Sequence, residues 1–135
     1  MAGSLYIVST PIGNLQDFTK RSIEILKDVD LVAAEDTRVT KKLFNHYNIK
    51  NSIISYNDYN ENQKYQYLLE VLKSNKDIAL VSDAGTPCIS DPGYRIVNAA
   101  NMLGINVVSV PGPSSAIAAL SVSGLPSDSF YFEGF

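Results

Sequence analysis

Short runs of apolar residues alternate with longer amphipathic segments along the whole chain. The runs are rich in Ile and Val, which is typical of strands that are covered on both faces of a sheet. The predicted strands are Leu5–Ser9, Leu31–Ala34, Ser52–Ser55, Ile78–Ser82 and Asn106–Val110, with a weaker one at Phe130–Glu133.

Two of the segments between strands place apolar residues at positions i, i+3, i+4 and i+7, which gives a helix one apolar stripe. These stripes are Tyr65, Leu68, Leu69 and Leu72, and then Ile96, Ala99, Ala100 and Leu103. A third helix is expected over Ser114–Ser123. For the helix with Ile96, we expect Asp91 as the N-cap, Pro92 as the first residue and Gly104 just past the end. Asp91 is therefore assigned to the helix and not to a functional site.

Repeated strand–helix–strand units predict a parallel sheet with right-handed crossovers. The expected fold class is α/β, an open, mostly parallel sheet of about five strands with helices on both faces. A composition of 45% hydrophobic and 19% charged residues agrees with a packed domain and argues against disorder.

Ligands of open parallel sheets bind beyond the carboxyl ends of the strands. Three loops follow predicted strands at that edge, with the sequences STPIGN (9–14), SDAGTP (82–87) and PGPSSA (111–116). Each combines Gly and Pro with hydroxyl or carboxyl side chains, so each offers fixed turns, close backbone approach and hydrogen-bonding groups. Turns of this composition are common in any protein, but three at one edge indicate a site. None is a G-x-G-x-x-G or P-loop motif, which disfavours a dinucleotide or a nucleoside triphosphate.

The net charge and the numbers of cysteines and histidines disfavour some classes of function. The net charge of −3 is not that of a general nucleic-acid binder, so any RNA contact must be local. The single cysteine, Cys88, allows no internal disulfide and is expected to be a packing residue. The only histidine, His46, is expected at the surface, and no cluster of residues suggests a metal site.

Membrane and export signals are not seen in the sequence. No apolar run approaches the roughly 20 residues that a spanning helix needs. The N-terminus, MAGSLYIVSTPIG, has neither a basic region nor a long apolar region, so we expect no signal peptide and a cytoplasmic protein without a membrane partner.

Four segments occur in order along the chain: YIVSTPIGNLQDFT, AAEDTR, ALVSDAGTPCISDPGY and VPGPSSAIAAL. They resemble the signature segments of the tetrapyrrole methylase superfamily, the class III S-adenosylmethionine-dependent methyltransferases. They are most similar to its ribosomal RNA branch, which methylates the ribose 2′-hydroxyl of a cytidine in small-subunit ribosomal RNA. The loop TPIGN departs from the G-x-G-x-G-D pattern of the tetrapyrrole enzymes, which favours the RNA branch.

The resemblance implies a two-domain enzyme that works as a homodimer and binds S-adenosylmethionine between its domains. Residues 1–135 would be the N-terminal α/β domain, with the C-terminal domain absent, so we expect the isolated chain to be inactive. The substrate would be small-subunit rRNA or the assembled small ribosomal subunit.

The resemblance also implies which residues contact the cofactor: Pro11, Ile12, Asp83, Ala84, Gly85, Thr86, Ser115 and Ala116. In this arrangement Asp83 would accept a hydrogen bond from the α-ammonium of the cofactor. Gly85 would allow the backbone to approach the cofactor closely.

Methyl transfer to a ribose hydroxyl needs two positioned reactants and a group that accepts the hydroxyl proton. Glu35 and Asp36 directly follow the second predicted strand at the ligand edge and are the candidate catalytic residues. The alternative is structural: Asp36 or Thr37 would cap the following helix while Glu35 pairs with Arg38.

Candidate RNA contacts lie in two neighbouring segments. Arg38 and Lys41 are expected on one helix face and suit phosphate contacts, although an ordinary solvated face has the same pattern. Asn60 is a further substrate-binding candidate. Tyr56 and Tyr59 are expected to stack on unpaired bases, whereas Tyr65 belongs to a helix stripe.

Two other functions stay open at this point. One keeps the superfamily but changes the substrate to a tetrapyrrole of the precorrin or uroporphyrinogen type, with methylation at carbon. The other is a module that binds a nucleoside or RNA without catalysis.

Overall fold

Five strands form one parallel sheet in the computed structural model, which describes residues 1–135. The strands are β1 (Leu5–Val8), β2 (Leu31–Ala34), β3 (Ile53–Ser55), β4 (Ile78–Val81) and β5 (Val107–Val110). Their spatial order is β3-β2-β4-β1-β5, and every pairing is parallel. The predicted fold class and its five main strands are confirmed.

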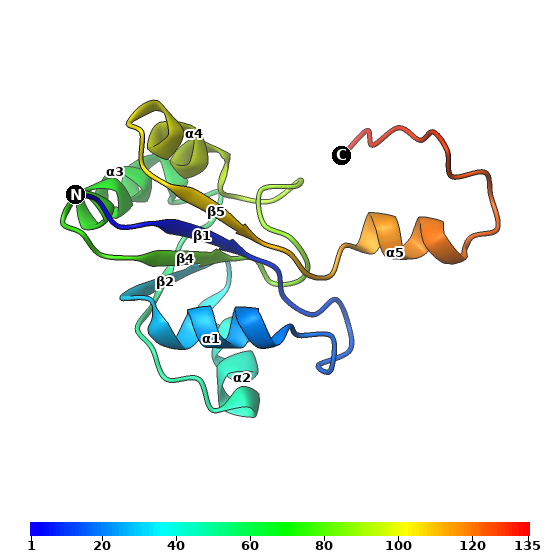
Figure 1. The fold of residues 1–135 in the computed structure, drawn as a ribbon, viewed down its shortest axis with the longest axis horizontal. Coiled ribbons are helices and arrows are strands. Elements are labelled where there is room, and N and C mark those ends of the chain that lie inside the picture. Colours follow the sequence, from blue (N-terminus) through cyan, green and yellow to red (C-terminus); the bar gives the residue numbers. More distant parts are fainter.

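Five helices connect or follow the strands: α1 (Lys20–Asp28), α2 (Thr37–Tyr47), α3 (Glu61–Lys73), α4 (Tyr94–Met102) and α5 (Ser115–Val122). α1 and α2 lie on one face of the sheet, and α3 and α4 lie on the other (Figure 1). None of them has the length and apolar composition needed to span a bilayer.

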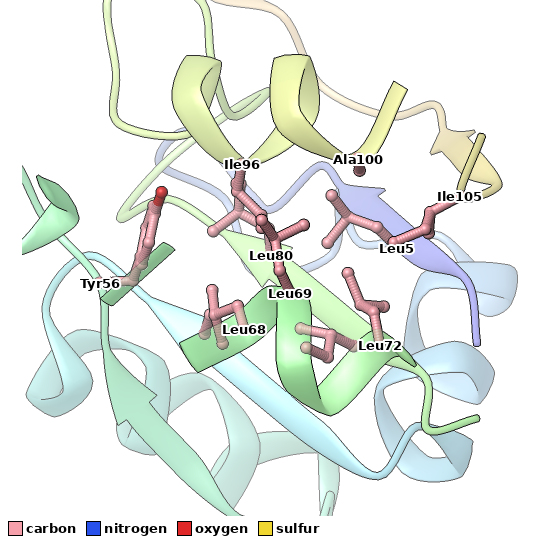
Figure 2. Close-up of a cluster of buried hydrophobic side chains, with 11 residues drawn as sticks. Leu5, Tyr56, Leu68, Leu69, Leu72, Leu80, Ile96, Ala100 and Ile105 are labelled. Atoms are coloured by element: carbon pink, nitrogen blue, oxygen red, sulfur yellow. The ribbon is translucent and has the colours of Figure 1, made fainter. Parts of the chain in front are cut away.

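The central strand β4 shows how alternate residues build two separate cores. Leu80 points toward α3 and α4, where it packs with Leu68, Leu72 and Ile96 (Figure 2). Ile78 belongs to the same core. The residues between them, Ala79 and Val81, belong to the core under α1 and α2. Both faces of β4 are buried, which explains its continuous apolar sequence.

The predicted start of α4 is wrong. The helix begins at Tyr94 with Gly93 as its N-cap, so neither Asp91 nor Pro92 has the predicted position. Gly93 has a φ of +132°, and a Cβ there would lie 2.5 Å from the Sγ of Cys88, so this position requires glycine. The end of α4 is as expected, because Gly104 follows the C-cap residue and has a φ of +69°.

The chain after β5 leaves the sheet. α5 has the expected bounds, with Ser114 and Ser123 as its caps, but it has no buried residue and projects away from the sheet (Figure 1). The predicted strand at Phe130–Glu133 is not formed, and these residues are exposed coil. Because α5 carries the chain away from β5, this segment has no strand beside it to pair with.

Candidate functional site

The three loops singled out from the sequence are joined into one unit at the carboxyl edge of the sheet. The backbones of Thr10 and Gly85 exchange two hydrogen bonds, each of 3.0 Å. The hydroxyls of Ser9 and Thr86 lie 2.9 Å apart, and the Thr86 hydroxyl donates to the carbonyl of Pro113 at 3.1 Å. The loops after β1, β4 and β5 therefore hold one another in place.

Close backbone approach explains the glycine in the third loop. A Cβ on Gly112 would lie 2.8 Å from the Cβ of Ser9, closer than side chains normally pack. Only glycine lets the loop after β5 lie this close to the end of β1. The left-handed backbone of Gly85, with a φ of +79°, makes the neighbouring turn in the same unit.

A cavity of about 480 Å³ lies against this unit, a size typical of small-molecule sites. The predicted cofactor contacts on its wall are Ala84, Gly85, Thr86, Ser115 and Ala116. The structure therefore brings together residues from the loops after β4 and β5. Residues 89–91, Ser114 and the C-terminal segment 131–135 complete the lining.

The other three predicted cofactor contacts lie around this cavity and not on its wall. Pro11 and Asp83 line a neighbouring cavity of about 460 Å³ that reaches toward α2. Ile12 lines a third cavity of about 440 Å³, together with Gly112 and Pro113.

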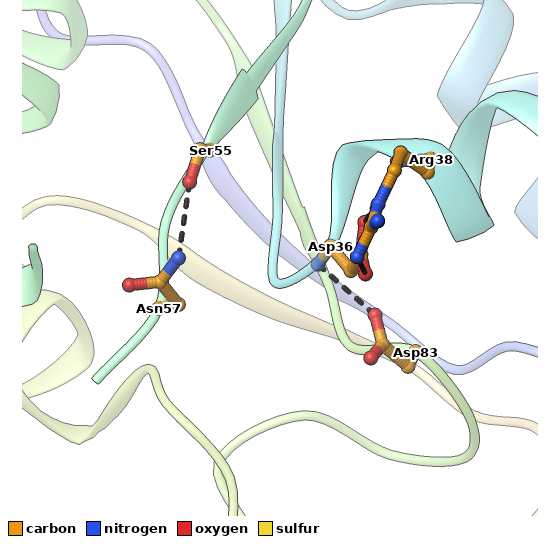
Figure 3. Close-up of polar contacts among 5 residues, drawn as sticks. All are labelled: Asp36, Arg38, Ser55, Asn57 and Asp83. Carbon is orange, nitrogen blue, oxygen red and sulfur yellow. Dashed lines mark hydrogen bonds and ion pairs between the residues drawn. The ribbon is translucent and has the colours of Figure 1, made fainter. Parts of the chain in front are cut away.

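Two carboxylates join the loops after β2 and β4. The N–H of Asp36 donates to Oδ1 of Asp83 at 3.0 Å (Figure 3). The N–H of Asp83 donates to Oε2 of Glu35 at 3.1 Å. Each loop thus supplies a carboxylate to the backbone of the other. Burial raises the pKa of both Glu35 and Asp83 above the ordinary range of carboxyl groups, and the backbone N–H bonds oppose that rise.

Asp36 has a different environment from Glu35. It is the N-cap of α2, where Oδ1 accepts a hydrogen bond from the N–H of Arg38 at 2.9 Å. The guanidinium of Arg38 adds a 2.8 Å ion pair to Oδ2, and these bonds lower the pKa of Asp36 to about 2. A carboxylate held in its ionised form is a weak proton acceptor. The structural alternative was therefore correct for the cap, but it was wrong in pairing Arg38 with Glu35.

The substrate-binding candidates fall into two groups. Arg38 lines a cavity of about 390 Å³ with Glu35, Asp36, Asp83 and the exposed Tyr59. Lys41 lies exposed on α2. The side chain of Asn60 is instead used within its own turn, accepting from the N–H of Asn57 at 2.9 Å and donating to Oγ of Ser55 at 3.0 Å.

The expectation that Tyr56 stacks on bases is wrong. Its side chain is fully buried in the core under α3 (Figure 2), and its hydroxyl donates to Glu61 at 3.0 Å. Tyr59, with 97% of its surface exposed, is the tyrosine of this segment that solvent reaches. His46 is exposed as expected, and Cys88 is partly buried.

The sequence prediction omitted two residues that contribute to the carboxyl edge of the sheet. Asp91 lines the largest of these cavities, and its place in SDPG, just after the SDAGTP loop, was a signal for this. Glu61 lies outside the cavity, yet it accepts a hydrogen bond from the N–H of Gly93, two residues after the lining residue Asp91. Nothing in the sequence near Glu61 indicated that contact.

The fold and the joined loops define an open parallel α/β domain with a small-molecule cavity at the carboxyl ends of its strands. Residues 4–133 match the family described as Tetrapyrrole (Corrin/Porphyrin) Methylases, and the chain belongs to this family. The resemblance seen in the sequence is thereby confirmed.

Several relatives share more than half of their aligned residues with this chain. It is 57% identical over 131 residues to "Ribosomal RNA small subunit methyltransferase I" of Vibrio cholerae, covering 97% of this chain and 46% of the relative. The protein of the same name from Escherichia coli O157:H7 is 56% identical over 133 residues, with 98% and 46% covered. The chain thus spans about half the length of these relatives.

A solved structure supports the same fold. The uroporphyrin-III-C-methyltransferase of Thermus thermophilus superposes with a TM-score of 0.69 over 93% of this chain and 55% of that protein. At 22% identity this likeness concerns the fold alone.

Proposed function

We propose that this chain is the N-terminal domain of a two-domain methyltransferase that acts on small-subunit rRNA. The proposed reaction transfers a methyl group from S-adenosylmethionine to the ribose 2′-hydroxyl of a cytidine. Family membership and the names of the relatives support methyl transfer to small-subunit rRNA. The observation that carries the proposal is the cavity in which the loops after β4 and β5 meet.

The residues of this cavity fit the cofactor. Its volume suits a nucleoside-sized ligand, and its wall combines small side chains with the hydroxyls of Thr86 and Ser115 and with backbone groups. S-adenosylmethionine supplies an electrophilic methyl group when it is bound. Ala84, Gly85 and Thr86 would hold it from one side, and Ser115 and Ala116 from the other.

Glu35 is the proposed acceptor of the hydroxyl proton. Its raised pKa lies nearer to neutral pH than that of an ordinary carboxyl group, which suits a general base. Asp36, with its low pKa and its ion pair to Arg38, would orient Arg38 and not accept a proton. Asp83 would act indirectly, because its carboxylate binds the backbone of the loop that carries Glu35 and Asp36.

Arg38, Lys41 and Tyr59 are the proposed RNA contacts. The two cations would contact phosphates, and the exposed tyrosine ring offers a stacking surface for an unpaired base. Asn60 would support this surface through its turn, in which it contacts Asn57 and Ser55. The RNA would be free or part of the assembled small subunit, in the cytoplasm, and the full-length enzyme would act as a homodimer.

Calorimetric titration of S-adenosylmethionine into the full-length protein tests the cofactor site. Ala116→Leu places a larger side chain on the cavity wall, whereas Ala119→Leu makes the same change on α5 away from that wall. We expect binding in the wild type and in Ala119→Leu, and strongly weakened binding in Ala116→Leu. Equal binding by both variants would place the cofactor elsewhere.

A turnover assay then separates the candidate functions. Radiolabelled S-adenosylmethionine is supplied with unmethylated small-subunit rRNA, with the small subunit, or with a uroporphyrinogen. Label in ribose supports the proposal, label in the tetrapyrrole favours the alternative enzyme, and binding without transfer favours the binding module. The isolated 135-residue chain is expected to transfer no methyl group, because it supplies one of the two proposed domains.

A further inference from the structure

The loop Cys88–Gly93 connects the end of the cavity to α4, and its middle residues Ile89, Ser90 and Asp91 line that cavity. Cys88 and Ser90 both have positive φ values, of 73° and 54°. Left-handed backbone is unfavourable for residues other than glycine, so such a loop persists only when surrounding contacts hold it.

Glu61, at the start of a different helix, contacts the end of this loop. Its Oε1 accepts a hydrogen bond from the N–H of Gly93 at 3.1 Å and another from the N–H of Arg95 at 3.3 Å. The hydroxyl of Tyr56, itself fully buried, donates to the same oxygen at 3.0 Å. One carboxylate oxygen thus joins the start of α3, the core and the end of the cavity loop.

The carboxylate of Glu61 takes the place of the N-cap side chain that α4 lacks. Gly93 occupies the N-cap position and has no side chain with which to cap the helix. The first N–H groups of a helix need acceptors, and a negative charge is favourable at that end. Glu61 provides both from the neighbouring helix, which lies beside α4 on the same face of the sheet (Figure 1).

We infer that Glu61 is a positioning residue for the cavity: its carboxylate holds the loop Cys88–Gly93 and so keeps Ile89, Ser90 and Asp91 on the cavity wall. Glu61 does not line the cavity and acts through the loop. The description of this cavity as a cofactor site rests on the proposed function. The coupling between Glu61 and the loop depends only on the contacts described above.

Cys88 provides a probe of the loop, since it is the only cysteine of the chain and is partly buried. Its Sγ would lie 2.5 Å from a Cβ at Gly93, so the thiol packs directly against the residue that Glu61 holds. Opening of the loop should expose the thiol to N-ethylmaleimide. Labelling is read at the Cys88 peptide by mass spectrometry, in this chain and in the full-length protein.

Two conservative variants separate the length of the Glu61 side chain from its charge. Glu61→Asp keeps the charge but shortens the side chain, so the contacts to Gly93 and Arg95 are lost. Glu61→Gln removes the charge but keeps an acceptor oxygen at the same reach. Charge must be separated from side-chain length because burial, and after it the nearby charge of Glu61, raises the pKa of the Cys88 thiol to about 11. Glu70→Asp, on the exposed side of α3, is the matched control.

We expect Glu61→Asp to label about tenfold faster than the wild type, the effect of losing a helix cap. Rates are compared per thiolate, from the pH dependence of labelling, because Glu61→Gln also lowers the pKa of the Cys88 thiol. On this scale Glu70→Asp should label at the wild-type rate, and Glu61→Gln should label much more slowly than Glu61→Asp. The acceleration should persist at urea concentrations far below unfolding, because it reports local opening. Equal rates in Glu61→Asp and wild type would overturn the inference, and so would equal acceleration by Asp and Gln.

Cofactor binding in the full-length protein adds a readout that a purely structural role would not change. Glu61→Asp should weaken S-adenosylmethionine binding by a factor similar to its labelling effect, with kcat at saturating cofactor unchanged. Loss of kcat with unchanged affinity would contradict a positioning role at this cavity. Absence of binding in the wild type would refute the proposed function, while the labelling rates would still decide the role of Glu61.

Discussion

Asp83 allows the charge of a site carboxylate to be separated from its hydrogen bond. The wild-type side chain accepts the N–H of Asp36 at 3.0 Å. In Asp83→Asn the amide oxygen keeps an acceptor in the same place without the charge. In Asp83→Ala the N–H of Asp36 loses its acceptor, and the loops after β2 and β4 lose one of the two bonds between them.

The expected magnitude for Asp83→Ala follows from the lost acceptor. A buried donor left unsatisfied costs about 1–3 kcal/mol, and the partial exposure of this site places the loss toward the lower end of that range. The remaining bond, from the N–H of Asp83 to Glu35, does not depend on the side chain at position 83 and should persist.

The direction of the stability change in Asp83→Asn follows from the pKa of Asp83. Burial raises the pKa of Asp83 in the folded state, and the nearby carboxylate of Asp36 adds to the rise. The stabilising contribution of such a group is fully present below its unfolded pKa, about 3.9, and is lost as the pH rises through its folded pKa. At pH 7 the partly desolvated charge of Asp83 therefore destabilises the wild type, and asparagine lacks that charge.

Urea unfolding of the wild type and both variants at neutral and at acidic pH measures these effects. At neutral pH we expect Asp83→Asn to be at least as stable as the wild type and Asp83→Ala to be the least stable. The advantage of asparagine over the wild type should disappear at acidic pH. Asp128→Asn, in the exposed C-terminal segment, controls for a general change of net charge. Equal losses in Asn and Ala at neutral pH would refute the reasoning.

Three further substitutions test the core, the joined loops and the RNA contacts. Leu80→Ala should reduce the free energy of unfolding by about 2–5 kcal/mol in urea titrations, because Leu80 is buried in the core under α3 and α4. Gly112→Ala should cost about 1–3 kcal/mol by overpacking against Ser9, and calorimetry should show weaker cofactor binding in the full-length protein. Arg38→Ala should leave the stability close to that of the wild type, because its ion pair with Asp36 is exposed. The same variant should weaken binding of small-subunit RNA and reduce its salt dependence by about one unit in a filter-binding titration at several salt concentrations.

Much of the fold could be predicted because strands and helices depend on local patterns. The apolar runs became β1 to β5, and the stripe with Leu68 and Leu72 became the buried face of α3. The ligand edge also followed from the sequence, since the carboxyl ends of parallel strands must meet at one edge of the sheet. The loops STPIGN, SDAGTP and PGPSSA are joined there by hydrogen bonds and close packing.

The failures concern residues whose surroundings come from distant parts of the chain. Asp91 has the composition of a cap, but Glu61 binds the backbone at the start of α4. Tyr56 stands in a polar segment, yet it is buried where α3 and α4 cover the sheet. The segment Phe130–Glu133 has a strand-like pattern, but no neighbouring strand is available to it.

The sequence by itself determined the elements of this protein, the edge at which they present their loops, and the residue types gathered there. Only the tertiary structure decided which of these residues line a cavity and which ones hold the loops together. Asp83 binds the backbone of Asp36, 47 residues away along the chain, and Glu61 binds that of Gly93, 32 residues away. Such contacts leave no periodic signal in the sequence, because they depend on how strands and helices pack in space and not on the spacing of neighbours along the chain.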